Sequence, residues 1–260
     1  MVDVPAAVAT MRRFLDERLE AADADGYVLG VSGGLDSTVA AHLAVDAVGA
    51  ERVVGMVMPD EPNLERNMRD ARALCDDLGV ERREADIRDV VSAVLDAVPY
   101  DPGRVATGNV RARTRMVLEY LEANHGDRLV LGAGNRSERA LGYFTKYGDG
   151  AVDVQPMGDL YKTEVVAVAR HLGVDERFVE KQPTAGLWPG QTDEGELEAS
   201  YDTIDRVLKR LVDGGQPAEA VAAETGVDLE LVRRFERMWR SSEHKRRRPP
   251  TADVGRDAVD

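Results

Sequence analysis

Residues 32–37, SGGLDS, have the types and spacing of a loop that binds phosphate. They stand between the apolar run YVLGV and the helically spaced run TVAAHLAVDAV, so they predict a turn from a buried strand into a helix. Gly33 and Gly34 allow a tight turn close to a ligand, toward which the first free N–H groups of the helix point. This arrangement predicts an anion site, most naturally for phosphate, with an ordinary strand-to-helix turn as the alternative. Because Asp36 would repel phosphate unless a cation lay between them, the loop also predicts magnesium.

A second polar, glycine-rich stretch, residues 132–166, follows an apolar run that predicts another buried strand. Glu138 lies a few residues beyond this strand and would share a metal with Asp36 if the two strands were neighbours. The alternative for Glu138 is a solvated charge on a surface helix. Lys162 begins a predicted helix, where a cation opposes the helix dipole, so phosphate binding would explain its presence.

The elements that must position these residues alternate between buried strands and helices. Strands are predicted at 27–31, 52–59, 81–86 and 128–131. Helices are predicted at 4–24, 38–48, 63–78, 87–97 and 106–125, with Asn63 as an N-cap and Gly79 as a C-terminal stop. The alternation predicts an α/β fold with a doubly wound parallel sheet, Rossmann-like or flavodoxin-like, whose ligands bind at the carboxyl ends of the strands.

The last third of the chain keeps helical patterns but has no convincing strand. We predict one domain over 1–260, with an α/β core to about residue 160 and a helical extension over 161–248 that covers one side of the sheet. Residues 181–196, KQPTAGLWPGQTDEGE, predict a long loop that acts as a lid, with a plain exposed loop as the alternative. Residues 249–260 predict a disordered acidic tail.

Composition excludes several classes of function. The formal net charge of -14 and a pI near 4.8 argue against a general nucleic-acid binder or a protein of anionic membrane surfaces. Five lysines against 29 arginines, on an acidic chain, predict adaptation to high salt, with an ordinary acidic protein as the alternative. The single cysteine, Cys75, predicts core packing and permits no internal disulfide. Since no signal core or membrane-length apolar run occurs, we expect a soluble, cytoplasmic protein.

Two levels of resemblance follow from these motifs. SGGLDS resembles the pyrophosphate loop of the N-type ATP pyrophosphatases, which split ATP into AMP and pyrophosphate. Together with GNRSERALGYFTKYGDG, PMGDLYKTEV, LWPGQTDEGEL and EHKRRRPP, in this order, the sequence is similar to the ammonia-dependent NAD synthetases. The resemblance implies that deamido-NAD, ATP and ammonia give NAD, AMP and pyrophosphate through an acyl adenylate, with magnesium. It also implies a homodimer with the dinucleotide near the subunit interface.

The resemblance further implies roles for individual residues. Magnesium would be held by Asp36 and Glu138. Contacts to ATP would come from Gly30, Val31, Ser32, Gly33, Gly34, Leu35, Asp36, Ser37, Ala133, Lys162 and Thr184. Contacts to deamido-NAD would come from Arg113, Lys146, Asp153, His244 and Lys245. The catalytic residues would be Lys162, which stabilises the departing pyrophosphate, and Asp153, which orients or deprotonates the incoming ammonium.

One position departs from the family pattern. Ala133 stands where the family usually has a threonine associated with ATP. The affinity for ATP would be weaker here if the hydroxyl matters and unchanged if the backbone makes the contact. Without the resemblance, a role as surface or strand-end residues would explain Arg113, Asp153 and His244 as well as ligand binding does.

Three rival interpretations remain open at this point. The same pyrophosphatase chemistry would serve an adenylylating enzyme of the guanylate or tRNA-modifying type, although the acidic charge disfavours tRNA. Glutamine is disfavoured as the direct nitrogen donor, because these residues leave no room for a glutaminase domain and no Cys and His pair is evident; a separate amidase partner stays possible in principle. Residues 216–248 have the outline of a helix-turn-helix followed by a basic run, which would suit a DNA-binding regulator.

Overall fold

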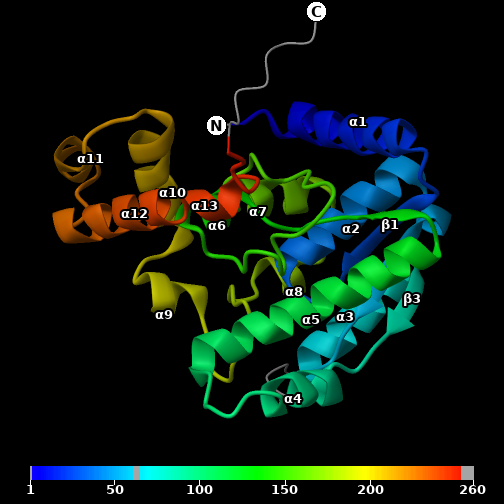
Figure 1. Cartoon of the computed structure of the whole chain (residues 1–260). Helices are drawn as coiled ribbons and strands as arrows, with labels where there is room; N and C mark the ends of the chain where they lie inside the picture. The colour runs from blue at the N-terminus through cyan, green and yellow to red at the C-terminus, as the bar shows by residue number, and fades with distance from the viewer. Residues whose placement is uncertain (1, 61–64, 253–260) are drawn as a thin grey trace, which may run out of the picture.

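A sheet of four parallel strands, in the order β3-β2-β1-β4, lies at the centre of the computed structural model, which describes residues 2–60 and 65–252 (Figure 1). The strands are β1 Gly26–Gly30, β2 Val53–Val57, β3 Glu81–Glu84 and β4 Arg128–Val130. The chain runs outward from β1 to β3 and then adds β4 on the other side of β1. The winding therefore reverses between β1 and β4, which is where such sheets bind ligands. The prediction of an α/β fold with a doubly wound parallel sheet is confirmed.

Helices cover both faces of this sheet. They are α1 Val4–Ala22, α2 Leu35–Val48, α3 Glu65–Leu78, α4 Arg88–Asp96, α5 Gly103–His125, α6 Arg136–Leu141, α7 Lys162–His171 and α8 Glu176–Val179. Side chains alternate along β1, so Tyr27 and Leu29 enter the core shared with α1, α2, α3, α7 and α8, whereas Val28 enters the core under α4 and α5. A short 3-10 turn, Ala50–Arg52, leads into β2.

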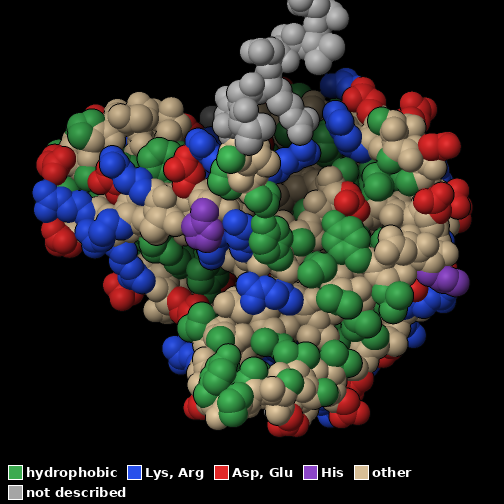
Figure 2. Space-filling model, viewed as in Figure 1, with side chains coloured by type: hydrophobic (Ala, Val, Ile, Leu, Met, Phe, Trp, Pro, Cys, Tyr) green, Lys and Arg blue, Asp and Glu red, His purple; other side chains and the backbone are tan. Residues whose placement is uncertain are grey.

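The outward sides of α4 and α5 carry apolar side chains that remain exposed. Val90 and Val94 of α4 are 46% exposed, while Val117 and Leu121 of α5 are 58% and 62% exposed. Each pair is spaced by four residues and so lies along one side of its helix. We call these four residues the outer apolar face, and Figure 2 shows apolar side chains gathered over this part of the molecule.

The helical extension has a core of its own. It comprises α9 Asp193–Leu197, α10 Tyr201–Leu208, a π-helical turn Lys209–Asp213, α11 Ala218–Thr225, α12 Leu229–Ser241 and α13 Glu243–Arg246. These helices pack on one another and on α6, with Ile204, Val232 and Phe235 fully buried between them. The expectation that the extension covers one side of the sheet is therefore wrong for these helices, and only α7 and α8 pack there (Figure 1).

Predictions about helix ends and about the last third of the chain can be compared with the structure where the residues are described. Gly79 ends α3 with a φ of +67°, as predicted. Asp3 caps α1, which was not predicted. Within the described residues, no strand follows the isolated bridge between Leu131 and Val154. Asn63, the predicted N-cap, and residues 253–260 of the predicted tail lie outside the described residues. In the part of the chain that the structure describes, no helix is long and apolar enough to span a membrane.

Candidate active site

The phosphate loop, residues 32–37, connects β1 to α2 as predicted. Helix α2 begins at Leu35, and no side chain caps its first turn, which leaves these backbone N–H groups available to an anion. Gly33 has a φ of +73°, and a Cβ there would lie 2.2 Å from the backbone oxygen of Asn67. Only glycine therefore fits at this position. Ser37 donates to the oxygen of Gly34 at 3.1 Å, which holds the loop closed on itself.

Asp36, Glu138 and Lys162, which are distant in sequence, meet beside this loop. The Lys162 ammonium forms an ion pair with the Asp36 carboxylate, and its Nζ lies 4.0 Å from Oε1 of Glu138. Glu138 reaches this place through a capping box, in which the Asn135 side chain accepts from the Glu138 N–H at 3.1 Å. The Asn135 amide also donates to Asp36 at 3.3 Å, so α6 and α2 are joined directly. Because β1 and β4 are neighbours, the carboxyl ends of the two strands bring these residues together.

Burial and charge shift the pKa values of this group. Burial would lower the pKa of Lys162, but Asp36 and Glu138 outweigh it and raise this pKa above its ordinary value. Burial and then the charge of Asp36 raise the pKa of Glu138 well above its ordinary range, against the opposing effect of Lys162. A lysine that is only 6% exposed between two carboxylates marks a place where a cation is electrostatically required.

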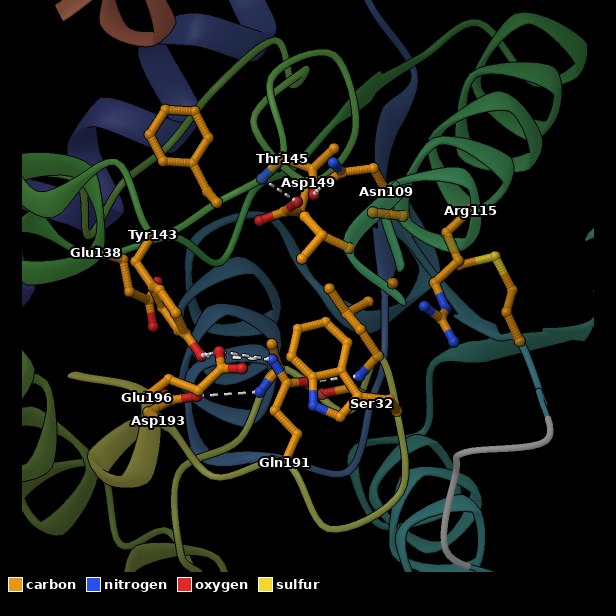
Figure 3. A pocket seen from close by; sticks show the side chains of 18 of the residues that line it. Ser32, Asn109, Arg115, Glu138, Tyr143, Thr145, Asp149, Gln191, Asp193 and Glu196 are labelled. Atoms are coloured by element: carbon orange, nitrogen blue, oxygen red, sulfur yellow. Dashed lines mark hydrogen bonds between the residues drawn. The ribbon is translucent and has the colours of Figure 1, made fainter. Parts of the chain in front are cut away.

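A cavity of about 470 Å³ opens beside this group (Figure 3). The ends of β1 and β2 form its floor with Val31, Met56 and Met58, and α5 forms one wall with Asn109 and Arg115. The segment after α6 forms the next wall, where Asp149 accepts from the Thr145 N–H at 2.9 Å and Thr145 donates to Asn109 at 2.8 Å. Of the residues expected to contact ATP, Gly30, Val31 and Ser32 line this cavity, whereas the others, residues 33–37, Ala133, Lys162 and Thr184, do not.

The segment 181–196 closes the cavity opposite α5. Its residues Leu187 and Trp188 lie against Gly108 of α5, and the Arg104 guanidinium stacks 4.8 Å above the Trp188 ring. Thr184 serves the fold of the segment, because its hydroxyl donates to the backbone oxygen of Gln191 at 2.7 Å. The segment is therefore a structured loop over the cavity rather than a plain exposed one, and its last residues begin α9.

Four of the five residues expected to contact deamido-NAD form one cluster. An Arg113 N–H donates to the oxygen of Lys146 at 3.2 Å, and the Lys146 ammonium donates to the oxygen of His244 at 2.7 Å. Lys245 donates to the oxygens of Gly142 and Phe144 and lines the cavity.

Asp153 lies apart from this cluster and from the cavity. Its carboxylate accepts from the Val130 N–H at 2.7 Å and from the Tyr120 hydroxyl at 3.1 Å, which ties β4 to α5. The structure thus does not bring Asp153 to Lys162, although both were expected to act in catalysis.

Comparison with known proteins identifies the family. A profile of the NAD synthase family matches residues 7–249. The chain belongs to the NAD synthase family. An NH3-dependent NAD+ synthetase of Thermococcus kodakarensis is 47% identical over 248 residues, which is 95% of this chain and 97% of that protein. One of Halobacterium salinarum is 49% identical over 241 residues, covering 92% of this chain and 90% of that protein.

Solved structures agree with this assignment. An NMN synthetase of Francisella tularensis has a TM-score of 0.86 and 33% identity, covering 98% of this chain and 100% of that one. An NH3-dependent NAD synthetase of Campylobacter jejuni has a TM-score of 0.83 and 30% identity, covering 97% and 100%. The chain is therefore an enzyme of the ligase class that forms a C–N bond, and the family and enzyme class predicted from its motifs are confirmed.

Sequence reasoning missed several side chains that this NAD synthase presents to the cavity. Arg115 on α5 lines the cavity, whereas Arg111, one turn earlier, does not and lies 2.9 Å from the buried carboxylate of Asp60. Glu119, one turn beyond Arg115, packs so closely on β1 that a Cβ at Gly30 would lie 2.3 Å from its Oε1. A signal was present, because residues 111, 115 and 119 recur every four positions on one side of a helix, whereas Arg113 faces outward.

Glu119 makes the stability of the protein depend on pH. Burial raises its pKa from 4.5 to about 7, with Arg115 opposing the shift and Asp149 adding to it. A raised acidic pKa contributes stability that is complete below pH 4.5 and is lost as the pH rises through 7. Wild type should therefore lose about 3 kcal/mol of unfolding free energy relative to Glu119→Gln between pH 4.5 and 7.5. Urea unfolding of both proteins across this range measures the difference, and parallel curves would contradict it.

Proposed function

We propose that this NAD synthase amidates deamido-NAD with ammonia to give NAD, using ATP and magnesium and releasing AMP and pyrophosphate, as a cytoplasmic reaction that completes NAD biosynthesis. The observation that supports it most is the placement of Lys162 between Asp36 and Glu138, at an uncapped helix N-terminus beside a large cavity. This combination suits a polyphosphate whose negative charge needs several cations and N–H donors at once.

The chemistry explains why such a site is needed. A carboxylate resists ammonia because it is anionic and its oxygen leaves poorly. Attack of the nicotinate carboxylate on the α-phosphorus of ATP gives an acyl adenylate and releases pyrophosphate, and ammonia then displaces AMP. Lys162 and the N–H groups of the phosphate loop would stabilise charge on the departing pyrophosphate. The loop 181–196 would keep water from the acyl adenylate until ammonia arrives.

Two carboxylates at the phosphate loop fit a magnesium site. Magnesium prefers carboxylate and phosphate oxygens and commonly takes only one or two ligands from the protein. Asp36 and Glu138 supply such a pair, and among the described residues no group of three or more His, Cys, Asp or Glu forms a cage that would hold an ion by itself. When bound, the ion would neutralise charge on the phosphates. Its remaining ligands would come from ATP and water.

The cluster of Arg113, Lys146, His244 and Lys245 is the site that we propose for deamido-NAD, and Asp153 is proposed as a further contact on the strength of the family resemblance. Arg113→Ala should raise KM for deamido-NAD about 20-fold, because a charge-assisted hydrogen bond is lost. KM for ATP should change less than about twofold, since Arg113 points away from the phosphate loop. Initial rates with each substrate varied in turn measure both constants. Arg13→Ala on α1 is the matched control, and an equal change in both constants would contradict the assignment.

The outer apolar face is the surface that we propose for a homodimer. Four exposed aliphatic side chains on adjacent helices are costly to leave in water and suit a symmetric contact. Leu121→Asp should shift the protein from dimer to monomer at micromolar concentration, because it would bury two carboxylates against apolar groups. Light scattering after gel filtration measures the mass. A monomeric wild type would contradict the proposal, as would a variant that stays dimeric.

The proposed function is tested by supplying ATP, magnesium and deamido-NAD with either ammonium or glutamine and measuring NAD and AMP. We expect NAD and AMP in equal amounts with ammonium and no NAD with glutamine. Because a similar structure is an NMN synthetase, the corresponding mononucleotide is supplied in a parallel reaction. Faster turnover of the mononucleotide would show that the mononucleotide, and not deamido-NAD, is the preferred acceptor. Release of AMP without amidation of either acceptor would indicate an adenylylating enzyme with a different substrate.

A further inference from the structure

Lys181, the first residue of the loop 181–196, reaches under the phosphate loop. Its ammonium donates to the backbone oxygen of Gly33 at 2.6 Å and to the carboxylate of Asp70 on α3. The side chains of Lys181 and Asp70 are each 15% exposed, and the Phe178 ring lies 5.6 Å from the ammonium. Two segments separated by 148 residues are thus joined at Gly33, a glycine of the phosphate loop with a positive φ.

The identity of this residue is informative because the chain uses lysine so rarely. Among its five lysines, Lys162 and Lys245 line the site and Lys146 belongs to the cluster beside it, while Lys209 pairs with Glu164 at the surface. Lys181 is the remaining one. Its compact ammonium fits between a backbone oxygen and a partly buried carboxylate, a place that the wider planar guanidinium of arginine suits poorly.

The contact with Gly33 has a direct consequence for the phosphate loop. The oxygen of Gly33 and the N–H of Gly34 belong to one peptide group, so a cation bound to the oxygen polarises the group and strengthens the N–H as a donor. Gly34 immediately precedes α2, and its N–H donates to the hydroxyl of Ser32, which lines the cavity, at 3.2 Å. Asp70 holds the ammonium at this oxygen, and the backbone oxygen of Asn67 on α3 lies so close to Gly33 that a side chain would not fit there.

We propose that Lys181 is a positioning residue for ATP, which it serves by polarising the phosphate loop and by fixing the loop 181–196 to it. The proposal rests on the proposed function, because it requires that the phosphate loop bind the pyrophosphate part of ATP. Under this proposal, Lys181 contributes to the affinity of the phosphate loop for phosphate. A loop that only covered the cavity would not affect that affinity.

Lys181→Cys, followed by chemical repair, tests the charge separately from the fold. The only native cysteine, Cys75, is buried and burial raises its pKa to about 11, so alkylation is directed to position 181. Bromoethylamine restores an ammonium of nearly the lysine length, whereas iodoacetamide adds a neutral group of similar size. Mass spectrometry verifies that one adduct forms. Lys209→Cys, treated in the same way, is the matched control.

We expect Lys181→Cys to raise KM for ATP and the inhibition constant of pyrophosphate together, by about tenfold, with KM for ammonium unchanged. Aminoethylation should restore both constants to within about threefold of wild type, and the neutral adduct should not. Constants within about twofold of wild type in the unmodified variant, or equal repair by the neutral adduct, would overturn the proposal. If wild type binds ATP but forms no NAD, the proposed function fails, and Lys181 is judged by calorimetric affinities for ATP and pyrophosphate.

Discussion

Asp36→Asn and Glu138→Gln should each lower turnover by about 1,000-fold, because each removes one of the two carboxylates proposed to hold magnesium against the phosphates. Both substitutions keep the size of the side chain. The amide oxygen introduced by Asp36→Asn would still accept from the Asn135 amide, so the contact between α2 and α6 is retained. The expected loss therefore comes from charge and metal binding rather than from misfolding.

The measurement is NAD formation as magnesium is raised from micromolar to tens of millimolar. Each variant should need more magnesium for half-maximal rate and should stay slow at saturation. Asp159→Asn is the matched control, because Asp159 is a highly exposed carboxylate that pairs only with Arg136 among the described contacts. Near-normal turnover of either variant at saturating magnesium would show that the metal assignment is wrong.

Local patterns in the sequence predicted the features that depend on neighbouring residues. The turn from β1 into α2 follows from an apolar run, two glycines and a helical run, and the parallel sheet follows from the alternation of strands and helices. The alternation does not determine strand order, so β4 as the neighbour of β1 was a condition for the metal site and not a prediction. Even the placement of Glu138 has a local cause, since Asn135 and Glu138 have the spacing of a capping box. That pattern turns the carboxylate back toward the strand end. The alternative, a surface charge on α6, did not take this capping interaction into account.

Contacts between distant segments could not be predicted in this way. The pairing of Lys181 with Gly33 and of Arg111 with Asp60 depends on how loops and helices meet after folding, and it leaves no periodic trace in the sequence. The extension was placed over the sheet because helical patterns continue there without a strand, but a helical pattern does not specify which surface the helix packs on. In the structure, the apolar sides of α10 and α12 pack in one core with α6 instead.

Lys162→Met should have the second large effect, because it removes the only described ion-pair partner of Asp36 at a buried position. Turnover should fall about 1,000-fold through loss of charge stabilisation on the departing pyrophosphate. The free energy of unfolding should also fall by about 3 kcal/mol, since two carboxylates are left beside each other without a cation. Lys209→Met, which removes a half-exposed lysine from Glu164, should leave turnover unchanged.

The double variant Lys162→Met with Asp36→Asn separates the two effects. Removing the Asp36 charge relieves the repulsion that the single change leaves behind, so stability should recover by more than half in urea unfolding. Turnover should remain as low as in either single variant, because both the ammonium and the metal-binding carboxylate are missing. Additive losses of stability would instead mean that Lys162 and Asp36 do not compensate each other in the folded protein. The charges of the pair would then act in phosphate binding and not in stability. Lys162 would contribute to the fold only through the packing of its aliphatic chain at the start of α7.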